Sequence, residues 1–199
     1  MKSALINVPV QSVESAPAAS RDLLKAAGSK FGFVPNLLGM FANAPALLEG
    51  YLTLAGIFDK TSLSPTERQV VLLAASFENG CEYCMAAHSA IAGMQKVDQG
   101  VIGALRDGDP IADAKLEALR SFAAEAVRTR GWPSTEAVAR FTGAGYTPAQ
   151  ALEVILGIGV KTLSNYANHL AATPLDGALA PVKWSKPGCG CGTGSCGAP

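Results

Sequence analysis

Two short segments of the sequence have the pattern of a helix start. Ser64-Pro65-Thr66-Glu67 and Thr147-Pro148-Ala149-Gln150 each place a hydroxyl residue before a proline and an acidic or amide residue three positions after the hydroxyl. In such a capping box each of the two side chains bonds the other residue's backbone amide, and proline suits the first helical position. Alanine is abundant and runs of β-branched residues are short, which also favours helix. The sequence therefore predicts an all-α fold.

The pattern of apolar residues and helix breakers predicts a single helical domain, 1–185, followed by a tail. Residues 1–17 contain Pro9 and Pro17 and predict an extended arm, and residues 28–38 predict a loop because they contain Gly32 and Pro35. Over 186–199 glycine, cysteine, proline and serine replace the apolar pattern, which predicts a flexible tail. We expect a bundle of about seven to eight helices, placed at 20–27, 45–58, 65–77, 81–95, 98–107, 111–129, 135–143 and 147–169.

The composition argues against two classes of partner. The 199 residues carry 16 Lys and Arg against 16 Asp and Glu, so the net charge is zero, whereas a nucleic-acid binder shows a basic stripe. The most apolar stretch, Ala151–Val160, contains Glu153 and is about half as long as a membrane span requires. Asn7 and Pro9 interrupt any apolar run of a secretory signal. We therefore expect a cytoplasmic protein that binds neither nucleic acid nor membrane.

Cys81, Cys84 and His88 form the chemically distinctive motif of the chain. If a helix begins near Cys81, all three lie within about 60° of one another on one face, and Cys84 and His88 can touch. Backbone amides at the helix N-terminus favour a thiolate at Cys81, and His88 can accept or relay the proton of Cys84. A disulfide between cysteines this close in sequence is suited to cycling rather than to holding a fold. The motif predicts a redox-active thiol pair.

Zinc binding is the main alternative for this motif. A Cys-x-x-Cys is half of many zinc sites, which take four ligands; His88 would be the third, and His169 or a tail cysteine the fourth. Inert buried cysteines are the remaining interpretation. Cys189, Cys191 and Cys196 form a separate set in the tail. They either bind a soft metal, exchange with the main pair, or are incidental thiols.

Several separated motifs carry a family resemblance. They are Phe31–Leu38, Leu63–Glu67, Asn79–Cys84 with His88, Ala144–Thr147, Asn165–His169 and Thr173–Asp176. In this order they resemble the alkylhydroperoxidase D-like proteins of the carboxymuconolactone decarboxylase superfamily, and among these the peroxidase-related branch. The resemblance covers about residues 30–176.

The resemblance implies an all-α fold that assembles as trimers or hexamers, and a thiol peroxidase that uses no cofactor beyond an external dithiol reductant. By this analogy Cys84 attacks a small peroxide and becomes a sulfenic acid, and Cys81 resolves it as a disulfide. A protein or small-molecule thiol then resets the pair. His88 would help to ionise Cys84.

Two positions depart from the family pattern. Well-studied members carry a glutamate twelve residues before the first cysteine and a histidine within the Cys-x-x-Cys, where this chain has Gln69 and Tyr83. Gln69 cannot relay a proton as a carboxylate does. Glu67 lies two residues before Gln69, which places it about 200° around the helix from Gln69, so it is expected to cap the helix rather than to replace the missing acid. Glu78 lies near a helix end, where water is expected to solvate it. The proton relay is incomplete, which predicts weak activity or a different substrate.

Other side chains are candidate accessory residues. His169 and Asn165 lie four residues apart on the last long helix and either face the thiol pair or lock helix packing. Tyr83 either donates a hydrogen bond to a substrate oxygen or packs with its hydroxyl at the surface. Trp132 and Trp184 are expected to anchor packing.

The motifs and the resemblance leave three candidate functions. The first is a thiol peroxidase or related disulfide reductase. The second is a decarboxylase of a lactone acid, the superfamily's other chemistry, which the resemblance does not tie to a Cys-x-x-Cys pair. The third is a non-catalytic metal-binding or stress-linked assembly.

Overall fold

The computed structural model describes residues 3–188, and every regular element in that range is a helix. The prediction of an all-α fold is confirmed. The elements are α1 (Ala18–Phe31), α2 (Asn36–Phe41), α3 (Pro45–Phe58), α4 (Pro65–Glu78), α5 (Glu82–Met94), α6 (Gln99–Asp107), α7 (Ala114–Arg128), α8 (Thr135–Gly143), α9 (Pro148–Ala171) and the 3₁₀ helix η1 (Gly177–Val182).

Both capping boxes form as predicted. Ser64 Oγ accepts from the Glu67 amide at 3.3 Å, and the Glu67 carboxylate accepts from the Ser64 amide at 2.8 Å. Thr147 and Gln150 make the same reciprocal pair at the start of α9. The capping role predicted for Glu67 is therefore confirmed, and an ion pair at 3.5 Å from Lys115 Nζ also holds its carboxylate.

The segment 28–38 is not the continuous loop that its breakers predicted. α1 runs through Gly28 and ends at Gly32, whose φ of 79° lies in the left-handed region that favours glycine. Pro35 then becomes the N-cap of α2. The two residues interpreted as breakers are thus the end of one helix and the start of the next.

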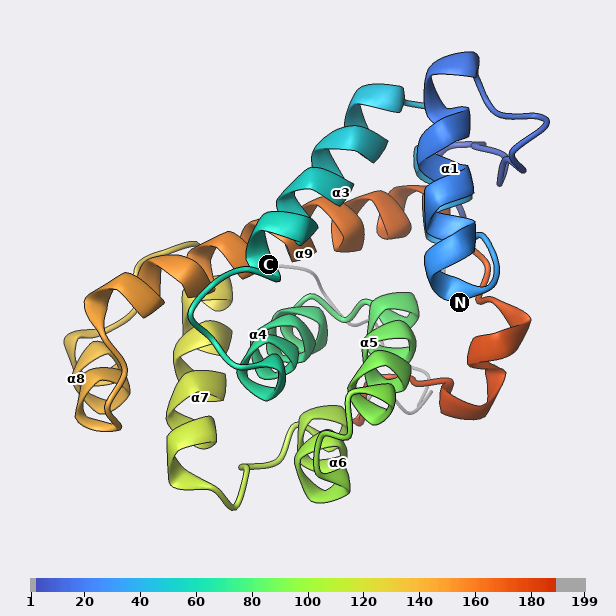
Figure 1. Ribbon diagram of the computed structural model, residues 1–199. Coiled ribbons are helices and arrows are strands. Elements are labelled where there is room, and N and C mark those ends of the chain that lie inside the picture. Colours follow the sequence, from blue (N-terminus) through green and yellow to red (C-terminus); the bar gives the residue numbers. More distant parts are fainter. Residues whose placement is uncertain (1–2, 189–199) are drawn as a thin grey trace.

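Helix α4 forms the centre of the main core. It packs against α5, α6, α7 and α9, and Figure 1 shows these helices arranged around it, with α8 at one end of the molecule and α1 at the other. Val70, Val71 and Leu73 on α4 are fully buried, and each such side chain contributes roughly 1.5–3 kcal/mol through burial. This core holds the end of α4, and therefore the start of α5, in a fixed place.

A second core cluster joins the N-terminal helices to the start of α5. Leu24 of α1, Phe41 of α2 and Leu48 of α3 are fully buried in it, together with Cys81 and Cys84. Residues 3–17, within the predicted N-terminal arm, contain no helix.

The arm packs along α2 and the end of α9. The Leu5 amide donates to the Leu170 carbonyl at 2.8 Å, and the Gln11 amide to the Gly39 carbonyl at 3.1 Å. A Cβ at Gly39 would lie only 2.6 Å from the Gln11 carbonyl oxygen, so this close approach requires glycine.

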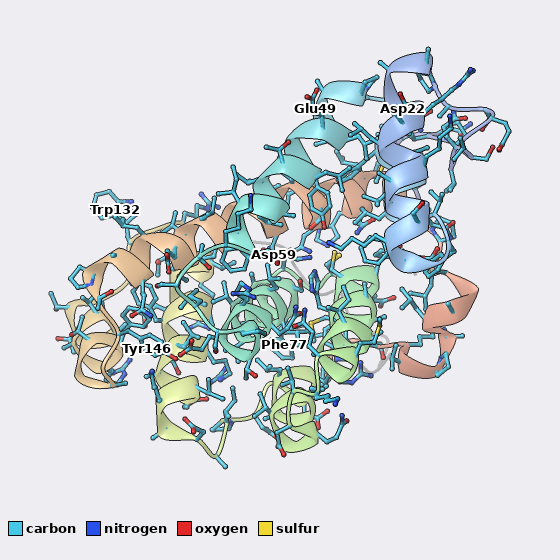
Figure 2. All side chains as sticks on the ribbon, in the orientation of Figure 1. Asp22, Glu49, Asp59, Phe77, Trp132 and Tyr146 are labelled. Carbon is cyan, nitrogen blue, oxygen red and sulfur yellow. The ribbon has the colours of Figure 1, made fainter. Side chains whose placement is uncertain are left out.

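The two tryptophans behave differently. Trp184 is buried and its indole N–H donates to the Arg106 carbonyl at 2.6 Å, as expected of a packing anchor. Trp132 is 84% exposed and projects into solvent (Figure 2), so the same prediction was wrong for it. The tail predicted at 186–199 lies outside the described residues from 189 onward. Within 3–188, the helices are too short or too polar to cross a membrane.

Candidate functional site

Cys81 and Cys84 lie at the sharp turn between α4 and α5. Gly80 makes this turn with a φ of 64°, and the Cys81 amide donates to the Ser76 carbonyl at 3.0 Å. Cys81 is the N-cap of α5 and Cys84 lies in its first turn. Both thiols are reduced, and each residue is only 1% exposed.

Helix α9 closes the site with a buried polar face. Its members are spaced three, four and seven residues after the first and are buried: Lys161, Ser164, Asn165 and Asn168. This spacing places them on one side of the helix. The Asn168 side-chain amide donates to Cys84 Sγ at 3.3 Å and to Cys81 Sγ at 3.7 Å. One amide nitrogen therefore contacts both sulfur atoms.

The electrostatics of the pair place the thiolate on Cys84. Burial opposes its ionisation, but the hydrogen bond from Cys81, the charge of Lys161 and the Ser164 hydroxyl outweigh burial, and they hold the pKa of Cys84 well below its usual value. The pKa of Cys81 is raised by its hydrogen bond to Cys84, by burial and by repulsion from the Cys84 charge. The favourable effect of the helix N-terminus on a Cys81 thiolate is thus outweighed by these three contributions.

His88 contacts α4 rather than the thiols. Its Nδ1 lies 3.0 Å from Gln69 Oε1, and none of the side-chain hydrogen bonds described within residues 3–188 joins it to either sulfur. A direct contact between His88 and Cys84 stays a prediction. Burial and the positive charge of Lys161 hold the pKa of His88 well below 6.5. With the amide oxygen facing the ring, Nδ1 carries the proton, and Nε2 is the nitrogen that can accept one.

Tyr83 has a structural environment. Its buried hydroxyl donates to Asp176 Oδ2 and accepts from the Leu37 amide at 3.2 Å. The second Asp176 oxygen accepts from the Asn36 amide at 2.9 Å. Neither a hydroxyl at the surface nor one directed at a substrate matches this arrangement. Tyr83 ties α5 to α2 and to the segment that follows α9.

The remaining candidate residues differ in their partners and in their exposure. Asn165 is buried and accepts from the Asn79 side-chain amide at 2.9 Å, so it braces the α4–α5 turn. His169 is exposed on α9 and is not part of the buried group. Glu78 forms an ion pair with Arg128 at 2.8 Å rather than being merely solvated. Glu67 caps α4, away from the thiols.

Two further features bear on ligands. Within residues 3–188, no three His, Cys, Asp or Glu side chains are arranged to hold a metal ion; the tail cysteines lie outside this range. A cavity of about 420 Å³ opens between α5, α6 and η1, but its lining contains neither Cys81 nor Cys84. Arg106 in that lining donates to Ser89 Oγ at 2.9 Å and to two carbonyls near η1.

Sequence reasoning missed Lys161, Ser164 and Asn168. A signal was present, since they form a single polar face on a helix that is otherwise largely apolar. Which helix that face meets depends on the tertiary fold. The motif residues Cys81 and Cys84 were found because their spacing alone brings them together.

Residues 45–125 match the model of the carboxymuconolactone decarboxylase family, and they contain Gln69, Cys81, Cys84 and His88. No curated protein matches the chain.

Three solved structures are similar in fold. One is an alkylhydroperoxidase AhpD core protein, an uncharacterized peroxidase-related protein from Ralstonia eutropha JMP134, with 18% identity, a TM-score of 0.77, and coverage of 89% of this chain and 96% of that chain. A peroxidase-related protein from Silicibacter sp. TM1040 has 19% identity, a TM-score of 0.75, and coverage of 88% and 93%.

The third is the debrominase Bmp8, as a cysteine-to-alanine variant in complex with 2,3,4-tribromopyrrole. It has 17% identity, a TM-score of 0.74, and coverage of 92% and 96%. Residues 45–125 thus match the carboxymuconolactone decarboxylase family, and the chain has the fold of these alkylhydroperoxidase D core proteins, which confirms the resemblance predicted from the motifs.

Proposed function

We propose that this protein is a thiol-dependent peroxidase in which Cys84 attacks the peroxide and Cys81 resolves the product. The observation that carries the proposal is the pair itself: two free thiols share the amide of Asn168, and their surroundings hold the pKa of Cys84 well below its usual value. A thiolate is the reactive form of cysteine, and a protonated neighbour is ready to react next. The family match and the fold of the neighbours support an enzymatic role that is peroxidase-related or decarboxylase-like.

The proposed reaction balances with one dithiol. The Cys84 thiolate attacks the terminal oxygen of a hydroperoxide, the O–O bond breaks, and the alkoxide leaves and takes up a proton as an alcohol. Cys84 is then a sulfenic acid. Cys81 sulfur displaces its hydroxyl as water, forming the Cys81–Cys84 disulfide. An external dithiol reduces this bond by exchange and becomes a disulfide itself.

His88 and Gln69 have a supporting role in this scheme. Gln69 stands where the family pattern has a glutamate, and it holds the Nδ1–H of His88 instead of relaying a proton. The neutral ring can accept a proton at Nε2 from water or substrate. Proton transfer then depends on His88 alone, which is consistent with a slower peroxidase than one with a carboxylate relay.

The test maps thiols by mass spectrometry before and after one equivalent of hydrogen peroxide. The wild type should form the Cys81–Cys84 disulfide. The Cys81→Ser variant should stop at a sulfenic acid on Cys84, trapped by dimedone, and Cys84→Ser should form neither product. A matched control with Cys189→Ser, Cys191→Ser and Cys196→Ser should retain peroxide turnover. Absence of dithiol-dependent peroxide consumption by the folded wild type would refute the proposal.

Reductive debromination is a second candidate, favoured by the likeness to Bmp8. The same dithiol can supply the two electrons that replace a carbon–bromine bond by carbon–hydrogen, releasing bromide and leaving a disulfide. Bromide release from 2,3,4-tribromopyrrole, with no peroxide turnover, would select this reaction. Decarboxylation of a lactone acid that survives Cys84→Ser would instead assign the site to the other chemistry of the family.

A further inference from the structure

Lys161 is a buried cation whose negative partner is not a carboxylate. Its side chain is fully buried on α9, and Nζ has no hydrogen-bond partner among residues 3–188. None of the ion pairs in that range includes it. An isolated ammonium in a protein interior costs several kcal/mol. A nearby anion must therefore compensate the charge.

The groups that face Lys161 leave one candidate for that anion. Tyr51 on α3 keeps its proton, because burial raises its pKa. Cys81 keeps its proton because of its hydrogen bond to Cys84, burial and the Cys84 charge. His88 is neutral. Cys84 remains, and its negative charge attracts Lys161 more strongly than that of any other neighbour.

We propose that Lys161 is the buried counter-ion of the Cys84 thiolate, and that this charge pair stabilises the reduced form of the Cys81–Cys84 couple over its disulfide. The helix spacing supports the placement, because Lys161 lies on the same face of α9 as Ser164 and Asn168, and the Asn168 amide contacts both sulfurs. Forming the disulfide removes the thiolate and leaves the ammonium without its partner. The couple is therefore an oxidising one that external dithiols reduce readily.

A charged pair of Lys161 and Cys84 determines how many protons the couple takes up when its disulfide is reduced. Reduction of the disulfide by two electrons takes up one proton, on Cys81, while Cys84 stays a thiolate. The reduction equilibrium against a reference couple should then change about tenfold per pH unit near neutrality, which corresponds to about 30 mV. A dithiol product would require two protons and a hundredfold change. The proposal goes beyond the proposed function, because it holds for any reaction in which this pair cycles.

The first experiment needs no substitution at Lys161. With the tail cysteines replaced by serine, the full chain is equilibrated with glutathione redox buffers between pH 6 and pH 8, and the disulfide fraction is measured by alkylation and mass spectrometry. A tenfold change per pH unit is expected, after correction for the known proton uptake of glutathione. A hundredfold change would overturn the inference.

The second experiment replaces the charge. Lys161→Met keeps the length of the side chain, and removing a buried charge need not impair folding. The thiolate absorbance at 240 nm should titrate at a pH at least one unit higher, and the redox equilibrium should shift at least tenfold toward the disulfide. Exposed Lys60→Met should change neither measurement. An unchanged titration and equilibrium in folded Lys161→Met would overturn the inference.

The two proposals fail separately. If the thiolate titrates as expected but the protein consumes no peroxide, Lys161 keeps its role and the peroxidase assignment falls. If peroxide is consumed but Lys161→Met leaves the titration unchanged, the peroxidase assignment stands and the counter-ion assignment falls.

Discussion

The side chain of Asn168 links two helices through a single amide. Its nitrogen contacts the sulfurs of Cys84 and Cys81, and its buried carbonyl oxygen has no partner among residues 3–188. An amide N–H near a thiolate stabilises its charge. The amide is therefore placed to respond when the sulfur atoms change their oxidation state.

Stability of the reduced protein should fall on acidification in two steps. The pKa of Cys84 is lowered from 9.0 and that of His88 from 6.5, so the unfolded chain binds more protons below each ordinary value. Stability from Cys84 is present above pH 9 and is lost as pH falls toward its folded pKa; that from His88 is lost below pH 6.5. Each slope reaches at most about 1.4 kcal/mol per pH unit.

Urea unfolding in excess reductant at several pH values measures both steps. Cys84→Ser should remove the slope between pH 6.5 and pH 9, and His88→Gln should remove the additional slope that appears below pH 6.5. The raised pKa of Cys81 affects the free energy of unfolding only above the ordinary thiol pKa of 9.0, so it does not oppose these trends at lower pH. A pH-independent free energy of unfolding between pH 5 and pH 8 would contradict the assigned charge states.

The sequence predicted the part of the site that is local. Cys81 and Cys84 share one turn of helix, so their spacing decides their proximity. Asn168 lies 84 residues from Cys84 in the chain, and only the packing of α9 brings it to the sulfur. The low pKa of Cys84 depends on the same distant helix, through the charge of Lys161, which an argument from the local helix dipole does not include.

At the scale of elements, α9 is the helix on which the site depends. It spans Pro148–Ala171 and packs against both α3 and α4. Gly157 lies where these helices meet, and a Cβ there would approach Phe58 to 2.7 Å and Val71 to 2.9 Å. A small residue at this crossing lets the helices approach closely and sets the depth at which Lys161 and Asn168 lie.

Gly157→Ala should destabilise the protein, whereas Gly159→Ala two residues later should stabilise it. The first adds a methyl group to a filled crossing, at about 1–3 kcal/mol, which exceeds the helix-propensity gain of about 1 kcal/mol. A Cβ at Gly159 would have its nearest neighbour, a methyl carbon of Leu54, at 3.9 Å, so only the gain in helix propensity remains. Denaturant midpoints of the two variants measure the difference, and equal midpoints would show that the crossing tolerates the methyl group.

The positions of most helices could be predicted from the sequence, because the residues that start and end a helix lie within it or next to it. α3 and α8 have the predicted bounds, Pro45–Phe58 and Thr135–Gly143, and both long helices with capping boxes begin where those boxes predict. The missed α2 has six residues, too few for a periodic pattern. Its start and the preceding stop use Pro35 and Gly32, which also occur in loops.

At the scale of the whole molecule, one group of hydrogen-bonded residues joins three parts of the chain. Tyr83 on α5, Asp176 after α9 and the backbone of Asn36 and Leu37 at α2 are hydrogen-bonded together. The C-terminal segment, the N-terminal helices and the thiol helix therefore depend on one buried phenol.

Tyr83→Phe should lower the free energy of unfolding by about 1–3 kcal/mol, because Asp176 Oδ2 and the Leu37 amide both lose the phenol hydroxyl as their hydrogen-bond partner. Peroxide turnover per folded molecule should remain, since the hydroxyl is occupied by structural contacts. Exposed Tyr166→Phe is the matched control and should change stability by less than about 0.5 kcal/mol. Lost turnover with unchanged stability would instead assign Tyr83 to the reaction.

The burial of the two sulfurs has a kinetic consequence. Residues that are 1% exposed meet a reagent mainly during local opening of the cluster that α1, α2 and α3 form over them. Their reactivity is then the product of an opening equilibrium and an intrinsic rate. A substitution that loosens these N-terminal helices without touching the thiols should make both cysteines react faster, so the least stable variant in this region would be the quickest to be labelled.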